Sequence, residues 1–107
     1  FIHVRDVVNA IIFTIKNFNR LRGDVYNLGL SSANISKIML AKKIKKKYKK
    51  LKIKIVTNRK DPDKRDYFVS NKKIEKKGFK AEISLDTGIS ELIQFYRHND
   101  NLIKNNY

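Results

Sequence analysis

Cations and carboxylates are concentrated in residues 59–66, RKDPDKRD, immediately before an aromatic and apolar run. Arg65 is the strongest candidate for a binding side chain in this segment. A guanidinium presents a planar fork of donors that suits phosphate, and it stays charged at any relevant pH. The alternative is a surface arginine that pairs with Asp63 or Asp66, and the residue types alone favour neither reading. The segment therefore predicts either an anion-binding loop or an ordinary solvated one.

The same segment does not predict a metal site or catalytic residues. Its aspartates, at 61, 63 and 66, could supply oxygen ligands, but the cations that alternate with them would repel a metal ion. His3 and His98 lie far apart, and neither has a metal-like partner at helical spacing. The HExxH, GxSxG and CxxC motifs are absent. We therefore expect no catalytic residue and no metal ligand in this chain.

The net charge of the 107 residues is +15. Such a charge can indicate a partner that is nucleic acid or an anionic membrane, or it can reflect the lysine-rich usage of an AT-rich genome. The densest run, KKIKKKYKK at residues 42–50, contains one aromatic residue and no arginine. Surfaces that bind nucleic acid usually interleave both with their lysines. A basic nucleic-acid-binding module is therefore the less favoured alternative.

The length, cysteine content and hydropathy limit the class of protein. A chain of 107 residues has room for one small domain. The absence of cysteine fits a reducing compartment, so a cytoplasmic location is expected. The longest apolar window, residues 7–15, is far shorter than the roughly 20 residues that span a bilayer. No membrane association is therefore predicted.

The hydrophobic pattern predicts an α/β order of elements, β-α-β-α-β-β-α-α. Short strands are expected at 1–4, 25–28, 51–56 and 67–69. Helices are expected at 7–18, from Ser31, Ser32 or Asn34 to about 50, at 72–77 and at 85–96. Asp6 is expected to cap the first helix, Ser70 or Asn71 the third, and Gly78 to end the third.

The predicted helix over residues 7–18 is apolar on more than one face. Its main stripe recurs at three and four residues, and two further side chains widen it. The stripe consists of Val7, Val8, Ile11, Ile12 and Ile15, widened by Ala10 and Phe13. A helix of this kind is normally covered on both sides. In so small a chain, part of that cover is expected to be missing.

Three stretches, taken in order, resemble the C-terminal part of an extended short-chain dehydrogenase/reductase. They are FIHVRDVVNAI, GDVYNLGL and DPDKRDYFVSNKKIEKKGFKAEISLDTGISELIQFY, and they extend from residue 1 to about residue 96. The resemblance is closest to the NAD(P)-dependent nucleotide-sugar epimerase/dehydratase family. It implies an α/β fold, the C-terminal portion of a Rossmann-type enzyme. Residues 1–31 would complete the Rossmann domain, and residues 32–107 would form a small substrate-binding lobe.

The resemblance also implies that this chain does not carry the chemistry by itself. The glycine-rich dinucleotide loop and the Tyr-x-x-x-Lys pair of the family are absent from it. NAD or NADP would bind in the complete enzyme and not to this chain alone. The missing Rossmann half would be supplied in cis or as a split partner, and the parent enzyme would be a homodimer. Whether that enzyme is an epimerase, a dehydratase or a reductase stays open, as does a non-functional gene fragment.

In this family, a basic residue before a YxVS-like strand reaches the diphosphate of the nucleotide-sugar substrate. The resemblance carries that role to Arg65. Many relatives place an Arg-Pro pair several residues earlier, where this chain has Lys60, Asp61 and Pro62 with Arg59 just upstream. Arg59 and Lys60 are therefore rivals of Arg65 for contact with the diphosphate.

Overall fold

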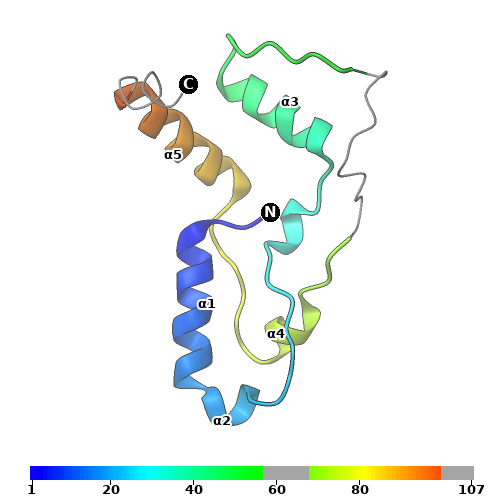
Figure 1. Cartoon of the computed structure of the whole chain (residues 1–107), viewed down its shortest axis with the longest axis vertical. Coiled ribbons are helices and arrows are strands. Elements are labelled where there is room, and N and C mark those ends of the chain that lie inside the picture. Colours follow the sequence, from blue (N-terminus) through cyan, green and yellow to red (C-terminus); the bar gives the residue numbers. More distant parts are fainter. Residues whose placement is uncertain (57–67, 100–107) are drawn as a thin grey trace. The chain divides into compact units, whose positions relative to one another are not determined.

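The computed structural model describes residues 1–56 and 68–99. These residues form α1 (Val4–Lys16), α2 (Phe18–Leu21), the 3-10 helix η1 (Ser31–Ala33), α3 (Lys37–Lys47), α4 (Lys72–Lys76) and α5 (Leu85–His98) (Figure 1). The chain divides into two compact units. Unit 1 comprises Phe1–Ile35 and Tyr67–Leu85, and unit 2 comprises Ser36–Asp66 and Asp86–Tyr107.

The prediction of an α/β, Rossmann-type portion is wrong, because the described residues contain helices and no β-strand. The hydrogen bonds of a strand lie between strands, so an apolar, alternating run becomes a strand only beside a neighbouring edge. Residues 1–3, 25–28, 51–56 and 68–69 form no ladder. Phe1 is joined to a later segment by two bonds that do not form a ladder: Leu30 N donates to Phe1 O at 3.0 Å, and Phe1 N donates to Ala33 O at 3.4 Å.

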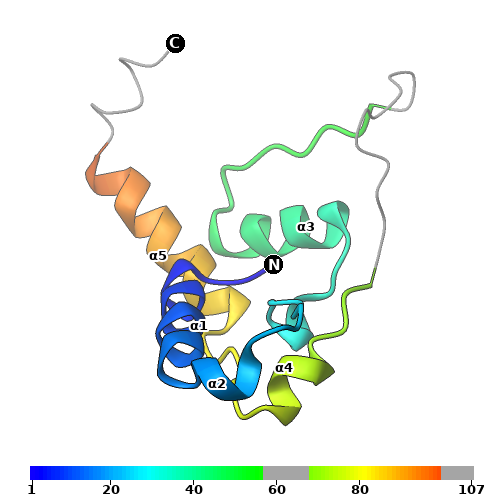
Figure 2. The same cartoon turned by 60° about the horizontal axis from the view of Figure 1, so that its bottom comes forward.

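The core of unit 1 lies where α1, α4 and the segment 79–84 meet. That segment runs between the two helices (Figures 1 and 2). Ala10, Ile74 and Phe79 are buried together, with Phe13 packed against them. The rings of Phe13 and Phe79 lie 5.6 Å apart in a tilted arrangement, a geometry that aromatic pairs favour. One face of α1 is thereby committed to this core.

Asp6 does not cap α1, contrary to the sequence prediction. The helix begins one turn earlier, and His3 is the cap, with its side chain accepting from Arg5 N at 3.2 Å. Asp6 is instead 3% exposed and accepts a 3.0 Å hydrogen bond from Ile83 N through Oδ2. A carboxylate that accepts from a backbone N–H makes one of the stronger classes of hydrogen bond. Asp6 therefore ties α1 to the segment that leads into α5.

The predicted end of the short helix at Gly78 is confirmed. α4 follows Asn71, and Gly78 adopts a φ of +101°, which a residue with a Cβ rarely adopts. Phe79 N donates to Ile74 O at 3.3 Å, and Gly78 N donates to Glu75 O at 3.0 Å. This is the Schellman arrangement, and Ile74 and Phe79 supply its usual hydrophobic contact within the core.

The second long helix begins later than predicted. Ser36 caps α3, since its Oγ accepts from Met39 N at 3.3 Å. Of the three predicted caps, Ser31 and Ser32 belong to η1 and Asn34 follows it. By contrast, α5 begins at residue 85 as the apolar spacing predicted and extends two residues further, to His98.

Candidate functional site

The three predicted diphosphate contacts, Arg65, Arg59 and Lys60, lie outside the described residues and stay predictions. The structure does describe Val69, which follows the segment that carries them. Asn34 Nδ2 donates to Val69 O at 2.9 Å, and Val69 N donates to Asn34 Oδ1 at 3.2 Å. Two paired strands exchange the same two bonds, but here one side chain makes both. Val69 is therefore held within unit 1 without the strand that was expected there.

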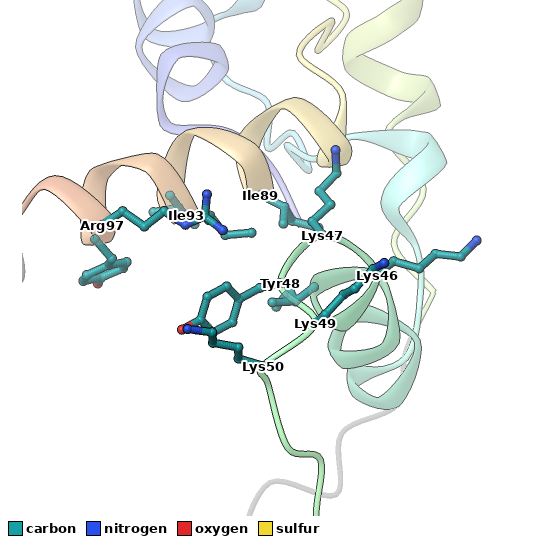
Figure 3. A pocket seen from close by; sticks show the side chains of 11 residues that line it. Lys46, Lys47, Tyr48, Lys49, Lys50, Ile89, Ile93 and Arg97 are labelled. Atoms are coloured by element: carbon teal, nitrogen blue, oxygen red, sulfur yellow. The ribbon is translucent and has the colours of Figure 1, made fainter.

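A groove of about 920 Å³ lies within unit 2, between the C-terminal end of α3 and α5. This volume is in the range of pockets that take small ligands. The floor is apolar, and it consists of Ile44 from α3 and Ile89, Leu92 and Ile93 from α5. Ile89 is the most deeply buried of them, at 5% exposed. Figure 3 shows Ile89 and Ile93 on the side of α5 that faces the end of α3.

Five cations and two tyrosines complete the lining. The cations are Lys46, Lys47, Lys49, Lys50 and Arg97, and the tyrosines are Tyr48 and Tyr96. Tyr48 points toward α5, whereas Lys46 points away from it (Figure 3). Among the described residues, no Asp, Glu, Asn or Gln side chain lines the groove. The groove therefore offers positive charge and aromatic faces above an apolar floor.

Two polar contacts hold α3 and α5 together beside this floor. Lys47 Nζ donates to Ser90 Oγ at 2.9 Å, and Lys43 Nζ lies 3.6 Å from Asp86 Oδ1. Both contacts are at least partly exposed, so each is expected to contribute little to stability. Their effect is geometric, because they link the last turns of α3 to the first turns of α5.

Arg97 brings an arginine beside the aromatic residue of the lysine run at residues 42–50. Its Cζ lies 5.8 Å from the centroid of the Tyr48 ring, which is within the range of a cation–π contact. Residues 42–50 contain one aromatic residue and no arginine. The structure adds Tyr96 and Arg97 from α5, about fifty positions away in the chain. No local pattern in the lysine run could have indicated this pairing.

Unit 2 holds most of the positive charge. It contains sixteen of the 25 Lys and Arg residues but six of the ten Asp and Glu residues, a net charge of +10. Like charges at this density raise the local potential and attract anions from solution. A groove with this charge and an aromatic lining is suited to an anion that also has a flat, apolar part.

The outer face of α1 carries five exposed apolar side chains, as the sequence predicted for a helix that lacks part of its cover. They are Val4 at 68%, Val8 at 49%, Ile11 at 55%, Ile12 at 44% and Ile15 at 70% exposed. Val4, Val8, Ile11 and Ile15 follow the 4-3-4 spacing by which helices pack along a seam. Unit 1 therefore presents an apolar surface that its own core does not use.

Glycine spacing and the grouping of metal-ligating side chains are the patterns by which dinucleotide and metal sites are typically recognised. The glycines of the chain are single and widely spaced, at 23, 29, 78 and 88, so no loop of closely spaced glycines opens a helix. No group of three or more His, Asp or Glu within 1–56 and 68–99 could hold a metal ion. In the same ranges, no helix is both long enough and apolar enough to cross a membrane.

One carboxylate outside the groove has a shifted pKa. The hydrogen bond that Lys73 donates to Asp24 lowers the pKa of that carboxyl below its ordinary value of 3.8. Lys73 also donates to Val25 O at 3.0 Å, so it ties the turn before residues 25–28 to α4. This pair is exposed and belongs to the scaffold of unit 1.

A comparison with protein-family models found none that matches the chain. The resemblance to the nucleotide-sugar epimerase/dehydratase family therefore rests on the order of its sequence motifs and stays a prediction.

Proposed function

We propose that this chain is the substrate-binding segment of a cytoplasmic, NAD(P)-dependent nucleotide-sugar epimerase or dehydratase, and that catalysis requires a separate dinucleotide-binding half. The observation that carries the proposal is the groove of unit 2. A sugar nucleotide combines a flat aromatic base with a diphosphate, and the groove combines two tyrosines with five cations. The tyrosines can stack on the base, and the cations can bind the diphosphate.

The base would stack on tyrosine, and the diphosphate would lie among ammonium groups. Stacking of a base on an aromatic side chain is worth about 1–3 kcal/mol. Lys49 and Lys50 line the groove beyond the end of α3 and can act as point charges on phosphate oxygens. Arg65, with Arg59 and Lys60 as rivals, is the second candidate set for the same diphosphate.

The outer face of α1 supports the need for a partner half. Five apolar side chains that are 44–70% exposed form a surface of the kind that mediates protein association. The proposal assigns this face to the half that holds NAD or NADP, whether that half is part of the same polypeptide or a separate subunit. The residues of this chain would bind and orient the substrate, and the partner half would supply the cofactor and the proton-transfer groups.

The proposal is tested by titrating the chain with nucleoside-diphosphate sugars in a calorimeter. We expect saturable binding of at least one of them and no binding of NAD or NADP. Replacing Tyr48 by Ala should weaken binding about tenfold through lost stacking. The matched control is Tyr26→Phe, a tyrosine of unit 1 that does not line the groove. Saturable NAD binding, or no binding of any nucleotide sugar, would count against the proposal.

Single substitutions decide between the two candidate sets for the diphosphate. A charge-assisted hydrogen bond is worth about 1.5–3 kcal/mol, so removing the true contact should weaken binding by roughly ten- to a hundredfold. Arg65→Ala, Arg59→Ala, Lys60→Ala, Lys49→Ala and Lys50→Ala are compared, with Lys72→Ala in unit 1 as the control. In a complete enzyme, the same change should raise KM more than it lowers kcat, because the diphosphate does not react.

A nucleic-acid partner predicts a different behaviour in the same assay. Neutralising several phosphates of a polynucleotide makes affinity fall steeply with salt, with a slope of about −0.7 per phosphate for single strands. A sugar nucleotide with two phosphate groups should show a shallow dependence. An oligonucleotide that displaces the nucleotide sugar at physiological salt would favour the basic nucleic-acid-binding alternative.

A further inference from the structure

The side chains that line the groove present N–H and O–H donors and almost no acceptors. Apart from the two tyrosine hydroxyls, every polar lining side chain is a lysine or an arginine, and neither type can accept a hydrogen bond. Edges of nucleobases differ in this respect, because oxo groups and ring nitrogens accept whereas exocyclic amino groups donate. The lining of the groove can therefore discriminate between bases.

We propose that the groove reads a 6-oxopurine, so that the substrate class is guanosine-diphosphate sugars; this inference rests on the function proposed above. Guanine carries two adjacent acceptors, O6 and N7, and a guanidinium fork donates to both at once. Arg97 is the only guanidinium among the described lining residues. It is the residue that would read the base, acting as a specificity determinant and not as a catalytic residue.

The position of Arg97 beside Tyr48 supports this role. Its Cζ lies 5.8 Å from the centroid of the Tyr48 ring, whereas atoms in direct contact are about 3.5–4.0 Å apart. The guanidinium thus lies near the ring without being stacked closely on it. A base that stacks on this face of Tyr48 would displace the guanidinium to the edge of the base, where its donors would meet the acceptors.

The other cations of the lining are less suited to reading a base. Lys47 already donates to Ser90 Oγ at 2.9 Å, and Lys46 points away from α5 (Figure 3). An ammonium group is also a point donor on a flexible stem, so it fixes the orientation of two adjacent acceptors less well than the planar guanidinium fork does. Lysines at 49 and 50 are accordingly assigned to the diphosphate, and base discrimination is assigned to Arg97.

Adenine and uracil fit this arrangement less well. Adenine replaces the O6 acceptor of guanine by an amino donor, so the Arg97 fork would meet one acceptor and one donor. Uracil has no two adjacent acceptors, because an N–H lies between its oxygens. A good two-point contact discriminates against the wrong base by about 1–3 kcal/mol. Because the groove is open to solvent, we expect a preference near the lower end, about tenfold.

The test measures the affinities of the chain for GDP, IDP, ADP and UDP by calorimetry, in the absence of any sugar. IDP shares O6 and N7 with GDP but lacks its 2-amino group, so IDP and ADP differ only at position 6 of the purine and its neighbouring proton. We expect GDP and IDP to bind equally and about tenfold more tightly than ADP and UDP. Circular dichroism melts of each variant confirm that the fold is retained.

Arg97→Gln provides the decisive comparison. A glutamine amide offers one donor and one acceptor, and this pair matches N7 and the 6-amino group of adenine. The variant should therefore reverse the preference, so that ADP binds more tightly than IDP. Arg97→Met keeps an unbranched apolar stem but no donor, and it should bind both purines equally. UDP affinity should change little in either variant.

The outcomes separate this inference from the proposed function. If IDP and ADP bind the wild type equally, or if UDP binds most tightly, the guanine assignment is wrong while nucleotide binding stands. If a purine preference exists but survives in Arg97→Gln, another group reads the base and the role of Arg97 is refuted. If no nucleoside diphosphate binds, both the inference and the proposed function fail.

Discussion

Three substitutions on the outer face of α1 should abolish self-association of the isolated chain. The triple variant Val4→Gln, Ile11→Gln, Ile15→Gln replaces side chains that are 68, 55 and 70% exposed. Glutamine has a helix propensity at least as good as that of valine or isoleucine, so α1 should persist. We expect the wild-type chain to associate at micromolar concentration and to bind a hydrophobic dye, and the variant to do neither.

The size of the effect follows from the exposed fractions. Complete burial of a Val or Ile side chain is worth about 1.5–3 kcal/mol. The five exposed fractions of the outer face together equal roughly three whole side chains, so covering the face is worth about 4–9 kcal/mol per copy. The triple variant removes about two thirds of this driving force. The parts of these three side chains already buried in unit 1 together equal about one whole side chain, so the free energy of unfolding should fall by about 1.5–3 kcal/mol.

Size-exclusion chromatography with light scattering at several concentrations gives the association state, and dye fluorescence gives the exposed apolar surface. The control variant, Asn9→Gln with Asn19→Gln, changes exposed polar positions and should behave like the wild type. A wild-type chain that stays monomeric and dye-free at all concentrations would refute the reasoning. So would a triple variant that associates as strongly as the wild type.

Three further predictions concern the scaffold of unit 1. Asp6→Ala should lower the free energy of unfolding by about 1.5–3 kcal/mol, because it removes the charged acceptor of the partly buried Ile83 N–H. Asp6→Asn should recover part of the loss, and denaturant titration measures both. Gly78→Ala should destabilise the fold by about 1 kcal/mol because of the φ of +101° and not through a clash, since the atoms nearest to the added Cβ are 3.8 Å away. Equal denaturant midpoints for the wild type and the variant would contradict this. Lys73 lowers the pKa of Asp24 in the folded chain, so the stabilisation from this pair should be complete above the unfolded pKa and lost as pH falls through the folded pKa. In NMR titrations, Lys73→Met should bring the Asp24 pKa back toward 3.8.

Local patterns in the sequence were sufficient for elements whose signals lie within a few residues. Gly78 could be predicted to end α4 because a left-handed residue after a helix depends on the chain next to it. The apolar spacing over residues 85–96 likewise predicted α5, since helical hydrogen bonds form within one segment. The excess of apolar positions on α1 was also visible, and it correctly indicated an uncovered face.

Strands, caps and the groove depended on residues far apart in the chain. The runs at 1–3, 25–28 and 51–56 have strand-like composition, but in the described residues no neighbouring edge pairs with them, so no sheet forms. The local sequence predicted Asp6 as a helix cap, and its actual partner could not be predicted because Ile83 is 77 positions away. Arg97 and Tyr96 were ordinary members of a C-terminal helix until α5 brought them beside the lysine run that ends α3. Sequence determined which segments could be helical and how much charge they carried, because these properties are local; only tertiary packing decided which cations and aromatic rings share one groove.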